Sequence, residues 1–266
     1  MGGEAVLKWL VTLSIFLPVL CFAETPFSGS WVVQPELTEF SLRSLGFDIS
    51  RGMFKRTSCV PTQEVPTDGS EHLIAGDPLT ESMSVRLVNK SRVDIARKAG
   101  GRLSWKGTYV VANDGRSMQL TFDDRRSTKA VTGTIQFARE TEGAADAHRL
   151  SGSWRAEKLL ALGGAGLEMT IQDTGNGLTM SASDGRSFDI KFDRQDYPLL
   201  GYLSGATVQV GRRAAQTLQI NGRQRGILVD FTIAVVADDG QTIKWGHLDM
   251  QCQSKTTWTL LKRHAP

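Results

Sequence analysis

Apolar and polar residues alternate with a period of two along much of this 266-residue chain. The alternation is strict in segments 117–123 and 187–193, and it recurs more briefly at 167–172 and 207–210. This period places one face of a β-strand on a hydrophobic core and the other face in water. Helical periodicity is weak, and its best candidate is 37–45. The pattern therefore predicts an all-β protein.

Turn signals separate the predicted strands. Asp-Gly and Asn-Gly pairs begin at Asp68, Asp114, Asn176, Asp184, Asn221 and Asp239. Glycine adopts the positive φ of tight hairpin turns without steric cost, and Asp and Asn tolerate it. Short strands with turns this frequent indicate antiparallel sheets joined by hairpins.

Two sequence patterns occur twice, at nearly the same spacing. The segment Ser28–Trp31 returns unchanged at Ser151–Trp154, and Val110–Met118 returns in altered form at Val235–Ile243. Recurrence at one spacing indicates duplicated domains in tandem.

The repeats set the expected domain boundaries. The first domain covers 24–142 and the second covers 149–266, with the small, polar segment 142–148 as a linker. Each contains about eight to ten candidate strands. Closing such a sheet into a barrel removes its exposed edges, although a sandwich also fits the spacing. The less regular segment 40–66 is a candidate cap or loop of the first domain.

Residues 1–23 have the features of a secretory signal peptide. Lys8 precedes an apolar run at 9–20, and small residues occupy the cleavage positions. A membrane anchor is the alternative, but the run is short for a bilayer span. Lipidation of Cys21 is disfavoured by Leu20 before it. We therefore expect a periplasmic or secreted protein with no stable membrane span after cleavage.

Charge and cysteine content narrow the picture further. The chain carries 31 Lys and Arg against 28 Asp and Glu, a net charge of +3, with the two signs interspersed. Nucleic-acid binding needs a concentrated basic stripe, so it is not expected. Cleavage leaves Cys59 and Cys252, which export allows to form a disulfide between the domains. Two separate buried thiols are the alternative.

The repeated Gly-x-Trp, ending at Trp31 and Trp154, resembles the lipocalin signature. In lipocalins this tryptophan plugs the closed end of an up-and-down barrel, and a basic residue on the last strand lies over the indole. Arg139 and Lys262 stand on otherwise apolar faces at the ends of the two halves. A cation over an indole contributes about 0.5–2 kcal/mol. The resemblance implies two tandem lipocalin-like antiparallel β-barrels.

The chain also resembles a group of bacterial secreted proteins with tandem lipocalin-like repeats. Their Gly-x-Pro or Asp-x-Pro turn is matched by Gly76–Pro78 and Asp196–Pro198, and their late hairpin by Asp114–Ser117 and Asp239–Thr242. This group has no assigned activity. The resemblance therefore implies a fold and export, and it carries over no catalytic residues.

Signals of catalysis and of metal binding are weak. There is no Gly-x-Ser-x-Gly nucleophile elbow, no His-x-His pair and no Cys-x-x-Cys pair. His72 and His247 are isolated, so a solvated or structural role is expected for each. We therefore assign no catalytic residues, metal ligands or cofactor, and we do not expect an enzyme.

Aromatic residues near barrel openings are the candidates for ligand contact. They are Trp105, Tyr109, Tyr197, Tyr202 and Trp245. For each, packing in the core or at the rim is the alternative. Tyr197 and Tyr202 come first, because they lie in a loop-like segment and loops often carry recognition.

These features favour an exported, non-catalytic binding protein for a small apolar ligand. The alternative is a structural or protein-interaction module of the bacterial cell envelope, with an envelope protein as partner. Barrels of this size either hold one small ligand or are filled by their own side chains. The interior volume therefore discriminates between the two functions.

Overall fold

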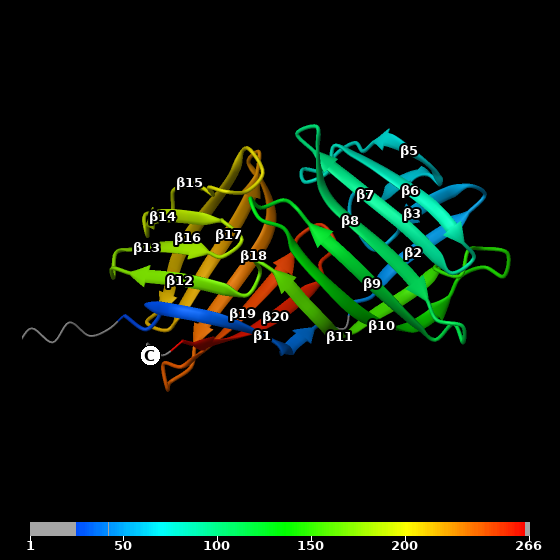
Figure 1. The fold of residues 1–266 in the computed structure, drawn as a ribbon. Coiled ribbons are helices and arrows are strands. Elements are labelled where there is room, and N and C mark those ends of the chain that lie inside the picture. Colours follow the sequence, from blue (N-terminus) through cyan, green and yellow to red (C-terminus); the bar gives the residue numbers. More distant parts are fainter. Residues whose placement is uncertain (1–24, 42, 264–266) are drawn as a thin grey trace, which may run out of the picture.

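The computed structural model describes residues 25–41 and 43–263, so the predicted signal peptide at 1–23 lies outside the described residues. Within the described part every regular element is a strand, which confirms the predicted all-β fold. The strands form two ten-stranded antiparallel sheets, each curled into a nearly closed barrel (Figure 1). No membrane-crossing helix occurs in these two ranges.

The first sheet, barrel A, is assembled from both ends of the chain. In sheet order its strands are β14 (Ser187–Lys191), β13 (Gly177–Ala182), β12 (Glu168–Asp173), β1 (Gly29–Phe40), β20 (Lys255–Lys262), β19 (Thr242–Asp249), β18 (Ile227–Val236), β17 (Thr217–Gln224), β16 (Ala206–Ala214) and β15 (Tyr197–Pro198). A β-bridge between Ser187 and Leu200 brings the two ends of the sheet together.

The second sheet, barrel B, is formed by the intervening chain. In sheet order its strands are β4 (Gln63–Pro66), β3 (Met53–Arg56), β2 (Leu45–Ser50), β11 (Gly152–Gly164), β10 (Val131–Glu142), β9 (Ser117–Asp124), β8 (Arg102–Val111), β7 (Arg92–Ala99), β6 (Ser82–Asn89) and β5 (Asp68–Leu73). The end strand β4 packs against β5 and β6, which nearly closes the barrel.

The two barrels do not coincide with the two contiguous repeats. Strand β1, from the first repeat, pairs with β12 and β20 of barrel A. Strand β11, from the second repeat, pairs with β10 and β2 of barrel B. Each repeat thus supplies its Gly-x-Trp strand to the other barrel. The boundaries 24–142 and 149–266 mark sequence repeats, whereas barrel B runs continuously from Leu45 to Gly164 and interrupts barrel A.

The exchange also changes the role of the predicted linker. Residues 142–148 join β10 to β11, which are adjacent strands of barrel B, and they do not connect two domains. The chain instead passes between the barrels after β1 and after β11. A small, polar composition is equally suited to a surface hairpin and to a linker, so composition could not separate the two.

Most of the predicted turns are present. Gly115, Gly185 and Gly240 have φ of 74°, 92° and 66°, and the Asp before each accepts a hydrogen bond from the backbone N–H two residues further on. The pair Asn221-Gly222 was wrongly predicted as a turn, because it lies within β17. The helix candidate at 37–45 is also wrong, since it covers the end of β1 and the start of β2.

Trp31 and Trp154 are completely buried, one in each barrel core. Each indole N–H donates to a backbone carbonyl four residues earlier, that of Phe27 at 2.9 Å and that of Leu150 at 2.8 Å. The glycine of the motif is required by the close approach of strands. At Gly152, where φ is 111°, a Cβ atom would lie 2.2 Å from a carbonyl oxygen of β10.

The predicted cations lie over these indoles, with partners from opposite repeats. The guanidinium carbon of Arg139 is 4.0 Å from the ring centroid of Trp154. The ammonium nitrogen of Lys262 is 5.6 Å from that of Trp31. Strand exchange therefore preserves the tryptophan–cation pair in each barrel, and each pair combines residues from the two repeats.

Candidate functional site

A cavity of about 270 Å³ lies in barrel B. Ligand sites for drug-sized molecules usually measure about 300–1,000 Å³, so this cavity suits a somewhat smaller ligand. Strands of barrel B form one part of its wall. The rest comes mainly from the end of β1 and the β1–β2 connection, from the β5–β6 connection, and from the β19–β20 connection with the start of β20, so the cavity lies where the two barrels meet.

Two neighbouring positions explain why the cavity occurs in barrel B. Leu120 and Ile135 are directly paired across β9 and β10, and both line the cavity. The corresponding pair in barrel A is Trp245 and Trp258, and Ile135 and Trp258 each lie four residues before the cation of their strand. Both indoles pack against the core of barrel A. Because an indole is larger than an aliphatic side chain, these two positions fill space in barrel A that is open in barrel B.

The rest of the cavity wall is mixed in character. Its further apolar residues include Leu45, Tyr109, Phe137 and Ala156. Its polar residues gather on the side that faces barrel A, where β3 and β7 end and β4 begins. Apolar walls with a few placed polar groups are typical of small-molecule sites.

Two arginines interrupt the inward apolar faces. Arg56 follows the buried Phe54 by two positions on β3, and Arg97 follows the buried Ile95 by two positions on β7. The period of two places both arginines on the interior side, and both line the cavity. The Nε atom of each is buried and has no hydrogen-bond partner among the described residues. The guanidinium carbon of Arg97 also lies 5.0 Å from the ring centroid of Trp105.

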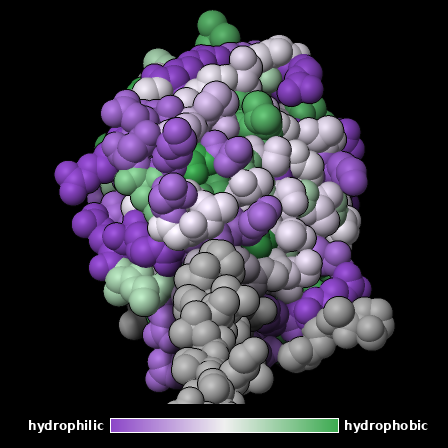
Figure 2. Space-filling view, turned by 90° about the vertical axis from the view of Figure 1, so that its left-hand side faces the viewer, coloured by the Kyte–Doolittle hydropathy of each residue, from purple (hydrophilic) through white to green (hydrophobic). Residues whose placement is uncertain are grey.

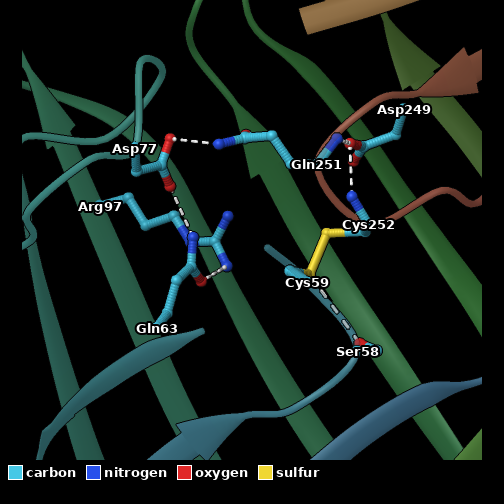
Figure 3. Close-up of a disulfide and its surroundings, with 8 residues drawn as sticks. All are labelled: Ser58, Cys59, Gln63, Asp77, Arg97, Asp249, Gln251 and Cys252. Carbon is cyan, nitrogen blue, oxygen red and sulfur yellow. Dashed lines mark hydrogen bonds between the residues drawn. A yellow bond between two sulfur atoms is a disulfide. The ribbon is translucent and has the colours of Figure 1, made fainter. Parts of the chain in front are cut away.

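Arg97 remains cationic at neutral pH. Burial, reinforced by the positive charge of Arg56, lowers the pKa of the Arg97 guanidinium to about 10. One Nη of Arg97 donates to the amide oxygen of Gln63 at 3.2 Å, and the amide nitrogen of Gln63 donates to Asp77 at 2.5 Å (Figure 3). A neutral amide therefore stands between this cation and the nearby carboxylate.

The β19–β20 connection is held against the cavity by two kinds of contact. Gln251 donates a hydrogen bond to Asp77 at 3.2 Å, and its carbonyl accepts one from the backbone N–H of Val60 at 2.9 Å. Beside it, Cys252 is bonded to Cys59, 193 residues earlier in the chain (Figure 3). The predicted disulfide thus joins the β19–β20 connection of barrel A to barrel B in the wall of the cavity.

The five aromatic candidates have different locations. Trp105 and Tyr109 line the cavity. Trp245 and Tyr197 pack against the core of barrel A, and the Tyr197 hydroxyl donates to Asp193 at 2.8 Å. Tyr202 lies near Arg126 of barrel B, whose guanidinium carbon is 6.0 Å from its ring centroid. Two of the five candidates therefore line the cavity and three do not, and core packing, the alternative for each, describes Trp245 and Tyr197.

Arg56 and Arg97 were missed in the sequence, although a signal was present. In both strands the alternating pattern assigns an arginine to an inward position, after Phe54 and after Val93 and Ile95. A charged residue on a core face is unusual and calls for a partner. That pattern could have identified the polar side of the cavity.

Other buried charged groups near the junction have partners. Arg126 also lines the cavity, but it forms an ion pair with Asp124. Although burial opposes ionisation, Arg126 holds the pKa of Asp124 below its ordinary value. Burial lowers the pKa of His247, whose ring nitrogen lies 3.4 Å from the Thr232 hydroxyl, which suits a neutral structural role. The described residues contain no group of three metal-binding side chains.

The side of barrel A that faces the viewer in Figure 2 carries no large apolar patch over its described residues. Figure 2 shows hydrophilic and hydrophobic side chains intermixed on that face, and over the described residues the hydrophobic ones do not gather into one large patch. Interaction surfaces are usually marked by larger contiguous apolar areas. The interior of barrel B is therefore the better candidate.

The contrast between the two barrels is the main basis for interpreting the cavity. No family model, curated protein or solved structure matches this chain.

Proposed function

We propose that the chain is an exported, non-catalytic binding protein that holds a small, largely apolar ligand inside barrel B. The observation that carries this proposal is the contrast between Leu120 and Ile135 in barrel B and Trp245 and Trp258 in barrel A. Two indoles pack against the core of barrel A at the positions whose smaller counterparts line the cavity of barrel B. The smaller side chains leave space in barrel B that suits a ligand.

Export and the barrel type belong to the same proposal. Residues 1–23 carry the signal-peptide features, and the Cys59–Cys252 bond is of a kind that persists in the periplasm or outside the cell. The resemblance to tandem lipocalin-like repeats of bacterial secreted proteins also supports a ligand held within a barrel.

Native mass spectrometry of the mature protein, purified from its natural host, tests the proposal. We expect a bound small molecule that is released on denaturation. The double variant Leu120→Trp/Ile135→Trp copies the packing of barrel A, so it should lose the ligand and keep its fold. The matched control is Thr121→Trp, which adds an indole to the exposed face of β9 and should retain the ligand.

Two results would contradict the proposal. One is a wild-type protein that carries no small molecule and binds none from a panel of apolar compounds. The other is a folded double variant that retains the ligand at the wild-type level. Either result would favour the alternative, an interaction module of the cell envelope, for which the interior has no binding role.

A further inference from the structure

The cavity of barrel B contains more positive charge than its carboxylates balance. Arg56 and Arg97 line it, and neither forms an ion pair with any carboxylate of residues 25–41 and 43–263. Each also has a buried Nε–H without an acceptor. A buried polar group without a hydrogen bond is costly, and a buried charge without a partner is more costly still.

The nearest acid is already occupied. One carboxylate oxygen of Asp77 accepts hydrogen bonds from the backbone N–H of Leu79 at 2.8 Å and from Gln251 at 3.2 Å. The other accepts from Gln63 at 2.5 Å. Asp77 therefore anchors the wall and the β19–β20 connection, and the Arg56 and Arg97 guanidinium groups remain available to an anion from outside the chain.

The duplicate barrel provides an internal comparison. In barrel B, Trp154 pairs with Leu45, and Phe47, two residues later, pairs with Arg56. In barrel A, Trp31 pairs with Met169, and Ile171, two residues later, pairs with Met180. Met180 therefore occupies the position in barrel A that Arg56 occupies in barrel B. Arg97 pairs with Trp105. The counterpart of Trp105 in the second repeat is Asp230, which pairs with Gly222, so Gly222 occupies the position of Arg97 in barrel A. The filled barrel thus has an uncharged residue at both positions. Barrel A has an inward arginine elsewhere, Arg212 on β16, but that cation forms an ion pair with Asp173.

We infer that the ligand of barrel B is a small amphipathic carboxylate, whose headgroup binds between Arg56 and Arg97 and whose apolar part lies against Leu120, Ile135 and Phe137. This inference rests on the proposed function and specifies its substrate class. A carboxylate has acceptors for two guanidinium groups, and arginine matches its planar geometry in paired hydrogen bonds. It would supply a counter-charge for the two guanidinium groups that line the cavity. The apolar lining and the modest cavity volume suit a medium-length acyl chain.

Calorimetric titration of the mature, disulfide-bonded protein with octanoate, octanol and octylamine tests the headgroup. The three probes share one chain length and differ in charge. We expect octanoate to bind at least about tenfold more tightly than octanol, since hydrogen bonds to charged groups are the stronger ones. Octylamine should bind most weakly. Raising the salt concentration should weaken octanoate binding and leave octanol binding nearly unchanged.

Variants then test whether the two arginines cause the preference for octanoate over octanol. Arg56→Met introduces the residue that barrel A has at this position, and Arg97→Met retains a stem of similar length. Each should reduce octanoate affinity at least about fivefold and leave octanol affinity unchanged or improved. Arg102→Met, at an exposed arginine on β8, is the matched control and should bind all three probes like the wild type. Thermal unfolding verifies that each variant is folded.

The outcomes separate the two proposals. If octanol and octanoate bind equally well, or if octylamine binds best, the anionic ligand is excluded while the proposed binding function stands. The same holds if both folded methionine variants keep the wild-type preference for octanoate. If none of the probes binds and the native protein carries no ligand, the proposed function itself fails.

Discussion

Arg139 and Lys262 occupy the same place over a buried indole but are bonded very differently. The Arg139 guanidinium donates to three backbone carbonyls, those of Gly115 at 2.6 Å, Ser151 at 2.8 Å and Arg149 at 2.5 Å. It therefore fastens the β8–β9 turn to the chain that enters β11. Lys262 has the indole contact at a longer distance and forms no hydrogen bond of this kind among the described residues.

This difference predicts unequal costs for removing the two cations. Arg139→Met should lower the free energy of unfolding by about 2–4 kcal/mol, because the indole contact is lost and several carbonyls lose their donor. Lys262→Met should cost about 0.5–1 kcal/mol, the value of the indole contact alone. Urea unfolding of both variants measures the two values. Equal losses would show that the carbonyl contacts of Arg139 contribute nothing.

At the same scale, the sequence predicted part of the candidate site. Of the five aromatic candidates, Trp105 and Tyr109 line the cavity. Tyr197 and Trp245 pack against the core of barrel A, which is the alternative that the sequence left open for each. Whether an interior is hollow depends on which side chains meet across strands, and that requires the register.

Among the elements, the strands were predictable and their allocation to barrels was not. Strands β1 and β11 carry the same Gly-x-Trp and the same inward pattern, so either could complete either barrel. The register offers a physical reason for the exchange. Trp154 pairs with Leu45. If Trp31 took that place, the chain would have to turn back near residue 38 to reach Leu45, which would shorten β1, whereas the exchange keeps β1 paired with β20 as far as Phe40.

The β19–β20 connection carries the second prediction at this scale. Its bond from Cys252 to Cys59 closes a very long loop of chain, and loss of such a bond usually costs about 2–5 kcal/mol. Cys59→Ser/Cys252→Ser should therefore unfold at a lower denaturant concentration than the wild type. Measuring both proteins with and without a thiol reductant checks this. Reductant should destabilise the wild type and have no effect on the double variant.

A different result would show that contacts other than the disulfide keep the β19–β20 connection in place. If the double variant and the reduced wild type were as stable as the oxidised protein, the hydrogen bonds of Gln251 to Asp77 and Val60 would suffice to keep it in place. The same variant also reports on access to the cavity. A loosened connection should speed both uptake and release of a bound ligand, with a smaller change in affinity.

In the whole molecule, the exchanged strands make one barrel continuous and the other discontinuous. Barrel B contains every one of its ten strands between Leu45 and Gly164, whereas barrel A needs β1 from one side of that segment and β12 to β20 from the other. The strands β1 and β11 also lie against each other (Figure 1). The boundary between the two sequence repeats therefore differs from the boundaries of the complete barrel B.

This division predicts which fragment folds. The fragment 45–164 has a complete barrel B, including Trp154 and its cation Arg139, and should be monomeric with a cooperative unfolding transition. The repeat-based fragment 24–142 lacks β11, so β2 and β10 lose their partner strand. Unpaired edges favour association between chains, and β1 could replace β11 only as a shorter strand that turns back near residue 38. Size-exclusion chromatography of the two fragments shows which one is monomeric, and thermal unfolding shows which one is more stable. A monomeric 24–142 that is more stable than 45–164 would show that the strands are not exchanged in solution.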